Sequence, residues 1–275
     1  MKKIISFFRE KFDKSLLPVF ALAAAAFLFY VPVLSFDYTW LDDIYLIFSR
    51  NSELRSFSFS DLLKQDFFLT GQSSSYLFYR PLALLPWIIA AKLAGTSLWI
   101  YHLENVLFHI AASLSLFALM RRVGISEKAS FVAMATFLFS VTGAAIAGFV
   151  PNLSYPMLLS FINLSFISGI NFLRGKKIRF LFSHLFFFML GMFTLETAVG
   201  FVPVFIFYAL FVSSKENKSI SMDSWKTAFG ISALYAAVFM LWYALRKCAI
   251  GGGMPSRDFS LVLDKIGRAS CRERV

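Results

Sequence analysis

The chain has 275 residues, of which 58% are hydrophobic and only 16% are charged, and 35 of them are phenylalanine. A soluble domain typically has about a quarter charged residues, so this composition excludes an ordinary water-soluble globular protein. A formal net charge of +11 would suggest nucleic acid as the partner of a soluble protein. Here the basic residues form short clusters between apolar runs, as in the cytoplasmic loops of membrane proteins, so we expect no nucleic-acid partner.

Several apolar stretches of about 18 residues or more carry almost no charge, which is the length that crosses about 30 Å of hydrocarbon. We therefore predict an all-α, polytopic bundle of about seven transmembrane helices. A long first external loop is expected to bear short interfacial helices. The protein is thus predicted to be integral and multi-pass, with membrane lipid as its solvent.

The first 14 residues contain five basic side chains and precede an apolar run over 15–36. A cleaved signal peptide also begins with a charged region followed by an apolar core. This run of about 22 residues exceeds the usual signal core, and no convincing small-residue cleavage site follows it. We therefore predict an uncleaved first helix with the N-terminus in the cytoplasm.

Residues 37–80 form the longest polar stretch, with six acidic and four basic side chains and several Trp and Tyr residues. Trp and Tyr favour the boundary between membrane and water. We expect an external loop whose short amphipathic helices lie on the bilayer surface. The segment 57–68 (FSFSDLLKQDFF) is the strongest helix candidate in it.

Beyond this loop, 82–93 is predicted to form a short interfacial or re-entrant helix that ends at Gly95. The apolar run 180–212 has 33 residues. One helix of that length would be about 50 Å long, so we predict a hairpin that turns near Glu196 and faces outside. The other crossings are expected at 98–120, 130–150, 157–173 and 228–245.

The last ten residues, 266–275 (IGRASCRERV), resemble the translation of a common sequencing adapter. We therefore expect the native domain to comprise 1–265, cut short at its C-terminus, and exclude the tail from fold reasoning. Without the tail, Cys248 is the single cysteine, so no intrachain disulfide is expected.

The sharpest polar feature is the pair Asp42 and Asp43, a few residues beyond the first predicted helix. Adjacent carboxylates disfavour each other's ionisation. A carboxylate at this boundary would be placed to take a proton from an acceptor hydroxyl while a lipid-anchored donor stays in the membrane. Both are therefore candidate catalytic residues. The alternative is that the pair only begins a surface helix, where negative charge is favourable.

Arg80 precedes Pro81 at the point where the loop returns to the membrane. A guanidinium binds phosphate through a planar group that stays charged. Arg80 is therefore a candidate for holding a lipid phosphate leaving group. The alternative is an arginine whose charge simply marks the interface.

His102, Asn105 and His109 have helical spacing, so they share one face of the helix predicted at 98–120. Such residues usually point into the bundle, either for function or for hydrogen bonds between helices. No third ligand accompanies the two histidines, so no metal site is predicted. Glu196 interrupts an apolar run and is a further functional candidate, with a solvated turn residue as the alternative.

Four segments, taken in this order, resemble the membrane half of the GT-C glycosyltransferases. The resemblance is to the protein O-mannosyltransferase-like branch, which includes the tetratricopeptide-bearing transmembrane O-mannosyltransferases. The segments are WLDD (40–43), SYLFYRPLALL (75–85), YHLENVLFHIAASLSLFALMRR (101–122) and LETAVGFVP (195–203).

This resemblance implies an inverting transfer of a sugar from a polyprenyl-phosphate donor to a hydroxyl of a protein or glycan acceptor, on the external face. It implies a catalytic base at Asp42 or Asp43 and a basic residue near Arg80 that assists the departing phosphate. We expect His102 to be the second donor-phosphate candidate, and we expect no cofactor. Asn105, His109 and Glu196 would be supporting polar residues.

Two other functions stay open from the sequence. The first is a transporter or flippase of lipid-linked or small substrates, which would show inverted repeats and helices broken at the midplane. The second is a non-catalytic membrane scaffold of the same fold. It is favoured by the lack of any acid or histidine in 141–156, where the resemblance implies a second acidic site.

Overall fold

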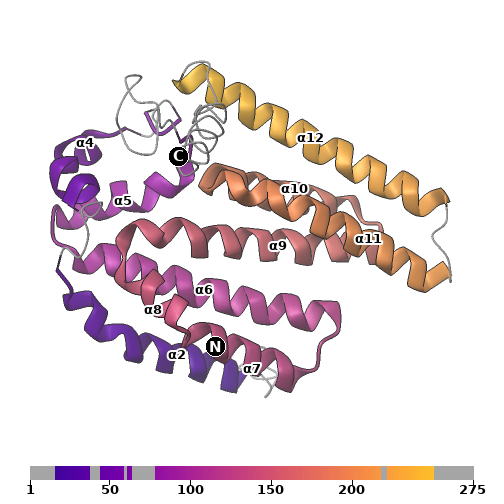
Figure 1. Ribbon diagram of the computed structural model, residues 1–275, viewed down its shortest axis with the longest axis horizontal. Coiled ribbons are helices and arrows are strands. Elements are labelled where there is room, and N and C mark those ends of the chain that lie inside the picture. The colour runs from indigo at the N-terminus through magenta and orange to yellow at the C-terminus, as the bar shows by residue number, and fades with distance from the viewer. Residues whose placement is uncertain (1–15, 38–43, 59–60, 64–77, 218–221, 251–275) are drawn as a thin grey trace, which may run out of the picture.

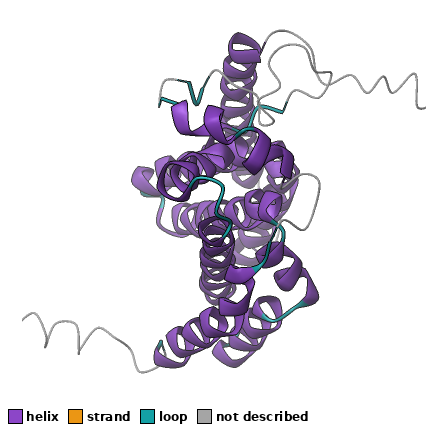
Figure 2. Ribbon diagram, turned by 90° about the vertical axis from the view of Figure 1, so that its left-hand side faces the viewer, coloured by secondary structure: helices purple, strands orange, loops and turns teal. Residues whose placement is uncertain are grey.

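The computed structural model describes residues 16–37, 44–58, 61–63, 78–217 and 222–250. Within these ranges all regular elements are helices and no strand is present (Figures 1 and 2). The predicted all-α class is therefore confirmed for the described part of the chain. The C-terminal segment 266–275, expected to be foreign, lies outside the described residues.

The elements before the first long bundle helix are α2 (Leu17–Tyr30), the 3-10 helix η1 (Val31–Ser35), the π-helix η2 (Ile44–Ser49), α4 (Asn51–Ser56) and α5 (Pro81–Ala94). The elements that follow are α6 (Trp99–Val123), α7 (Glu127–Leu138), α8 (Val141–Gly148), the 3-10 helix η4 (Val150–Leu153), α9 (Ser154–Gly175), α10 (Ile178–Thr194), the 3-10 helix η5 (Glu196–Gly200), α11 (Phe201–Asn217) and α12 (Met222–Ile250).

Four helical segments are long and apolar enough to cross a membrane, namely Leu17–Ser35, Trp99–Val123, Val150–Gly175 and Trp225–Ala249. α7 and α8 together make a fifth, with a bend of 48° between them. Each of these segments overlaps one predicted from the apolar runs. α5, α10 and α11 are apolar but shorter.

The helix ends follow from local residue chemistry. Pro81 starts α5 at a position where no backbone donor is needed, and Gly95 ends it with a φ of +61°. Gly124 ends α6 with a φ of +98°, a conformation that glycine adopts without a Cβ clash. Ser126 and Ser140 cap α7 and α8, because their Oγ atoms accept from the N–H groups of the third residue on.

α10 and α11 form the predicted hairpin. The ring of His184 in α10 lies 4.4 Å from that of Phe205 in α11, centroid to centroid. In one continuous helix these residues would lie about 30 Å apart. The chain therefore turns back through Leu195 and η5, at the position predicted for Glu196.

α9 lies at the centre of the bundle, between α6 on one side and α10 on the other (Figure 1). α2 and the α7–α8 pair cover α6, while α12 packs on α10 and α11. α5 and the short α4 form one end of the molecule, where Trp87 is the largest fully buried side chain.

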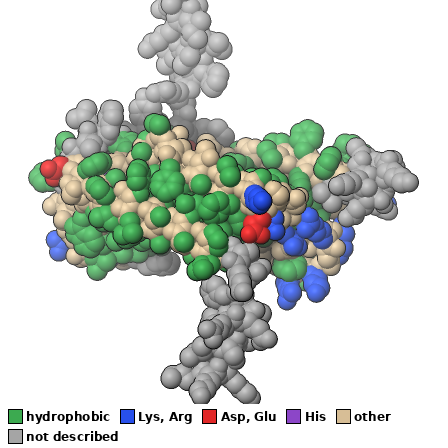
Figure 3. Space-filling model, turned by 90° about the horizontal axis from the view of Figure 1, so that it is seen from below, with side chains coloured by type: hydrophobic (Ala, Val, Ile, Leu, Met, Phe, Trp, Pro, Cys, Tyr) green, Lys and Arg blue, Asp and Glu red, His purple; other side chains and the backbone are tan. Residues whose placement is uncertain are grey.

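The outer surface is largely apolar, as expected for a protein solvated by lipid. Figure 3 shows one face covered by hydrophobic side chains, with Lys and Arg gathered at one end. Large apolar side chains stay exposed on the outermost helices, for example Phe207 in α11 at 74% and Phe229 in α12 at 78%. Such exposure would be costly in water and is favourable in hydrocarbon.

The predicted helix at 57–68 is wrong wherever the structure describes it. Phe57 and Ser58 are not helical, and 61–63 form a turn. Within this turn, Asp61 Oδ2 accepts both the Ser58 N–H at 3.0 Å and the Ser58 hydroxyl at 2.7 Å. Two short helices, η2 and α4, lie in the described part of the loop before this segment. The short helix predicted at 82–93 is confirmed as α5.

Candidate functional site

Several of the predicted site residues gather at the end of the bundle where α5 and α6 begin and where η5 makes its turn. The first loop leaves this end at Phe36 and returns to it at Phe78. Asp42 and Asp43, the predicted catalytic residues, lie outside the described residues, between Asp37 and Ile44. Their role stays a prediction.

Arg80 and Glu196 form a two-pronged ion pair across 116 residues of sequence. Arg80 Nε donates to Glu196 Oε2 at 2.8 Å, and Nη2 donates to Oε1 at 2.5 Å. The two side chains keep 14% and 33% of their surface exposed, respectively. The Arg80 guanidinium also lies 4.3 Å from the centre of the Phe78 ring. Paired hydrogen bonds of this kind hold both side chains in one orientation.

Tyr79 anchors the backbone that carries Arg80. Its ring is buried and packs edge-on against Phe193 of α10 and at a tilt against Trp242 of α12. Its hydroxyl donates to the carbonyl of Leu63, on the other side of the first loop. Burial raises the pKa of the Tyr79 phenol, which therefore stays protonated and able to donate at neutral pH.

His102, Asn105 and His109 are fully buried on one face of α6, where they form hydrogen bonds to α7 and α8. His102 Nδ1 donates to the carbonyl of Ala147 at 3.2 Å. Asn105 Nδ2 donates to the carbonyls of Ile146 at 2.7 Å and Phe149 at 2.8 Å. Because both acceptors are carbonyls, the orientation of the amide is settled.

His109 completes this row of donors. Its Nε2 donates to the carbonyl of Leu138 at 3.1 Å, and the Tyr30 hydroxyl of α2 donates to the same oxygen. Leu138 is the last residue of α7, so its carbonyl has lost the partner that a continuous helix would supply. The face predicted to be polar is therefore the support of a broken helix, which is the hydrogen-bonding alternative described above.

A second buried polar cluster joins α9, α10 and α12 around His184. The Nδ1 of His184 donates to the Ser165 carbonyl at 2.8 Å, and its Nε2 accepts from the Tyr235 hydroxyl at 2.8 Å. The Ser165 hydroxyl donates to the carbonyl of His184 at 2.9 Å. The partners of His184 lie on two other helices, so only the fold reveals them.

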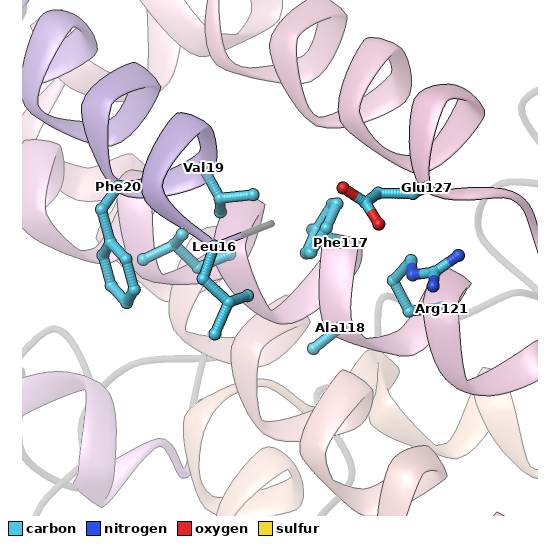
Figure 4. Close-up of a pocket in the computed structure, with 8 residues that line it drawn as sticks. Leu16, Val19, Phe20, Phe117, Ala118, Arg121 and Glu127 are labelled. Atoms are coloured by element: carbon cyan, nitrogen blue, oxygen red, sulfur yellow. The ribbon is translucent and has the colours of Figure 1, made fainter. Parts of the chain in front are cut away.

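A cavity of about 520 Å³ lies at the other end of α6, between α2 and the α6–α7 turn (Figure 4). None of the predicted site residues lines it. Among the described residues, no three His, Cys, Asp or Glu side chains come together as a metal site would require.

The chain matches no protein-family model, no curated protein and no solved structure.

Proposed function

We propose that this protein is a GT-C-type membrane glycosyltransferase, which transfers a sugar from a polyprenyl-phosphate donor to a hydroxyl acceptor on the external face. The proposal starts from the resemblance of four ordered sequence segments. It is supported by the way the described parts of those segments meet at one end of the bundle.

The observation that carries the proposal is the ion pair between Arg80 and Glu196. Each residue belongs to a different one of the resembling segments, and the fold joins them next to Phe78, where the loop that holds Asp42 and Asp43 returns to the bundle. An always-charged guanidinium held in one orientation at headgroup depth is suited to a phosphate group. Glu196 occupies the Nε and Nη2 edge, so a donor phosphate that binds this edge would replace the carboxylate.

The proposed reaction is an inverting displacement. Asp42 or Asp43 takes the proton of the acceptor hydroxyl, and the hydroxyl oxygen forms a bond to the anomeric carbon. The bond from that carbon to the phosphate oxygen breaks, and the phosphate leaves with the electron pair. Arg80 stabilises the charge that develops on the leaving phosphate. The step needs no cofactor.

The proposed topology has seven crossings, with α7–α8 counted as one and α10 and α11 as two short ones. The N-terminus and the basic turns that include Arg121 and Lys176 would face the cytoplasm. Arg80 and Glu196 would then face outside, on the same side as the loop that carries the proposed base.

The transporter alternative finds one supporting feature, the broken helix α7–α8. In a transporter, broken helices expose backbone groups to a substrate cavity. Here the carbonyls next to the break and at the end of α8 bond to side chains of α2 and α6. This arrangement supports a static bend, so we prefer the transferase.

The experiment that tests the proposal measures sugar transfer by the purified full chain in detergent. The donor is a radiolabelled polyprenyl-phosphate mannose, the acceptors are a Ser/Thr-rich peptide and an oligosaccharide, and the product is counted after organic extraction of the lipid. We expect transfer by the wild type and a loss of about 100-fold or more in Asp42→Asn or Asp43→Asn, whichever removes the base. Asp61→Asn, in the same loop, is the matched control.

Equal transfer rates in both aspartate variants and the wild type would eliminate the proposed base. Donor movement between leaflets of a vesicle without sugar transfer would favour a flippase. If a correctly folded wild type shows neither sugar transfer nor donor movement, the result would favour the scaffold.

A further inference from the structure

We infer that the cavity between α2 and the α6–α7 turn is a binding site for a membrane phospholipid with a phosphoethanolamine head group. The cavity has a volume of about 520 Å³ and lies at the end of the bundle opposite Arg80 and Glu196. It is independent of the sugar-transfer chemistry.

The walls of the cavity match a lipid tail. Val19 of α2 and Phe117 of α6 form a buried apolar floor, with 3% and 7% of their surface exposed. Phe20 and Ala118 line its exposed rim. Both helices are long and apolar enough to cross a membrane, so this groove runs along hydrocarbon. An acyl chain is the apolar ligand that a bilayer supplies there.

The mouth of the cavity carries one charge of each sign. Arg121 and Glu127 stand on one side of the cavity, with the α2 residues on the other (Figure 4). Arg121 lies in the last turn of α6 and Glu127 in the first turn of α7, so each helix end stabilises the charge beside it. Arg121 Nη1 donates to the Ile125 carbonyl at 2.9 Å, which holds the guanidinium at the mouth.

This pair of charges selects the head group. A guanidinium binds a phosphodiester, and a carboxylate accepts hydrogen bonds from a primary ammonium. Phosphoethanolamine carries both groups a few bonds apart. A purely anionic head group would meet the Glu127 carboxylate without a compensating cation, and a choline head group has no N–H to donate. The zwitterionic head with a primary amine is therefore the best match.

The test is a lipid titration of the purified full chain in a non-ionic detergent, followed by native mass spectrometry. Phosphatidylethanolamine and phosphatidylglycerol with identical acyl chains are the two probes. We expect the wild type to retain phosphatidylethanolamine about threefold to fivefold more tightly, the contribution of one partly exposed ionic contact. Glu127→Gln should remove this preference, and Arg121→Gln should weaken the binding of both lipids.

Two further variants separate the cavity from lipid bound around the whole protein. Ala118→Phe fills the groove without changing any charge and should reduce retained phosphatidylethanolamine about tenfold. Lys128→Gln removes a neighbouring exposed charge that does not line the cavity and should change nothing. Thermal unfolding of each variant verifies the fold.

Equal retention of the two lipids by the wild type would overturn the assignment. So would unchanged retention in folded Ala118→Phe, or a failure of the wild type to retain either lipid because the groove is covered by the chain itself.

Discussion

Arg80 and Glu196 show how single ionic side chains are accommodated at the edge of an apolar bundle. Each would be costly there alone, because burial penalises an unpaired charge. Together they form two parallel hydrogen bonds between always-charged guanidinium and carboxylate. Their pairing also links the start of α5 to the α10–α11 turn, so it stabilises the end of the bundle where the candidate site lies.

A double-mutant cycle with Arg80→Met and Glu196→Gln should give a coupling energy of about 1–2 kcal/mol, because the paired geometry is ordered and only partly exposed. The measurement is unfolding in a denaturing detergent. The pair Arg50–Glu53, three residues apart and more exposed, is the control and should couple by about 0.3–0.5 kcal/mol. Equal coupling energies in the two pairs would contradict the claim that the ordered geometry strengthens the Arg80–Glu196 pair.

Gly143→Ala should destabilise the protein by about 1–3 kcal/mol through overpacking. An added Cβ would lie 2.6 Å from His109 Nε2 and 3.0 Å from the Leu138 carbonyl oxygen, the two atoms joined by a hydrogen bond. Gly230→Ala in α12 is the control, because its Cβ would meet nothing within 4 Å. It should be neutral or raise the stability by about 0.5–1 kcal/mol. If Gly143→Ala unfolded with the same curve as the wild type, the overpacking explanation would be refuted.

At the scale of the elements, the α7–α8 bend is maintained by its neighbours. A break inside a membrane helix frees backbone carbonyls, and hydrocarbon offers them no water. In this fold, His109 of α6 and Tyr30 of α2 donate to the Leu138 carbonyl at the bend. His102 and Asn105 of α6 donate to carbonyls at the other end of α8, those of Ile146, Ala147 and Phe149. The position of α8 therefore depends on its neighbours as well as on the bent segment.

Asn105→Leu tests this dependence. The change keeps the size of the side chain and removes the two hydrogen bonds to the Ile146 and Phe149 carbonyls, so we expect a loss of about 1–2 kcal/mol in unfolding free energy. Asn152→Leu removes one exposed hydrogen bond to Ala145 and is expected to cost much less. If the two variants were equally stable, the Ile146 and Phe149 carbonyls would have other hydrogen-bond donors.

The sequence predicts those helices that follow from the length and charge of one apolar run, such as α6 and α9. Ser140 is a local cap signal inside the run 130–150, but the bend also depends on donors from α6 and α2, which the run does not contain. The described residues of the helix expected at 57–68 are not helical, and the other residues of that segment lie outside the described ranges.

The candidate site is predictable only in its parts. Arg80 and Glu196 stand out separately in the sequence, one before a proline and one inside an apolar run. That they pair depends on the packing of α5 against α10, which no local pattern contains. Ser165, His184 and Tyr235 likewise meet only through the packing of three helices. The catalytic role of Asp42 and Asp43 stays a prediction.

At the scale of the whole molecule, basic side chains collect at one end of the bundle. Arg121, Lys128, Lys176 and Lys226 lie at the α6–α7, α9–α10 and α11–α12 ends. The end with Arg80 and Glu196 lies opposite. Other basic residues lie at this opposite end and go against the asymmetry, namely Arg50, Arg55, Lys92, Arg246 and Lys247. Because basic residues are retained on the cytoplasmic side, we predict from this distribution that the end with Arg121 and Lys176 faces the cytoplasm.

Cysteine labelling in intact cells tests this orientation. In a background with Cys248→Ser and Cys271→Ser, we expect a membrane-impermeant maleimide to label Ser52→Cys from outside. Lys176→Cys should react only after the membrane is opened. Both positions are exposed. Labelling of Lys176→Cys in intact cells would invert the topology and place Arg80 and Glu196 in the cytoplasm.

The supports of the α7–α8 bend have a consequence for how the chain is made. Tyr30, His102, Asn105 and His109 all precede the carbonyls that they serve. During synthesis from the N-terminus, α2 and α6 therefore leave the ribosome before the segment that must bend between them. The kinked segment can therefore enter the bilayer when the donor side chains of α2 and α6 are already present, so its free carbonyls need not be exposed to lipid without hydrogen-bond partners.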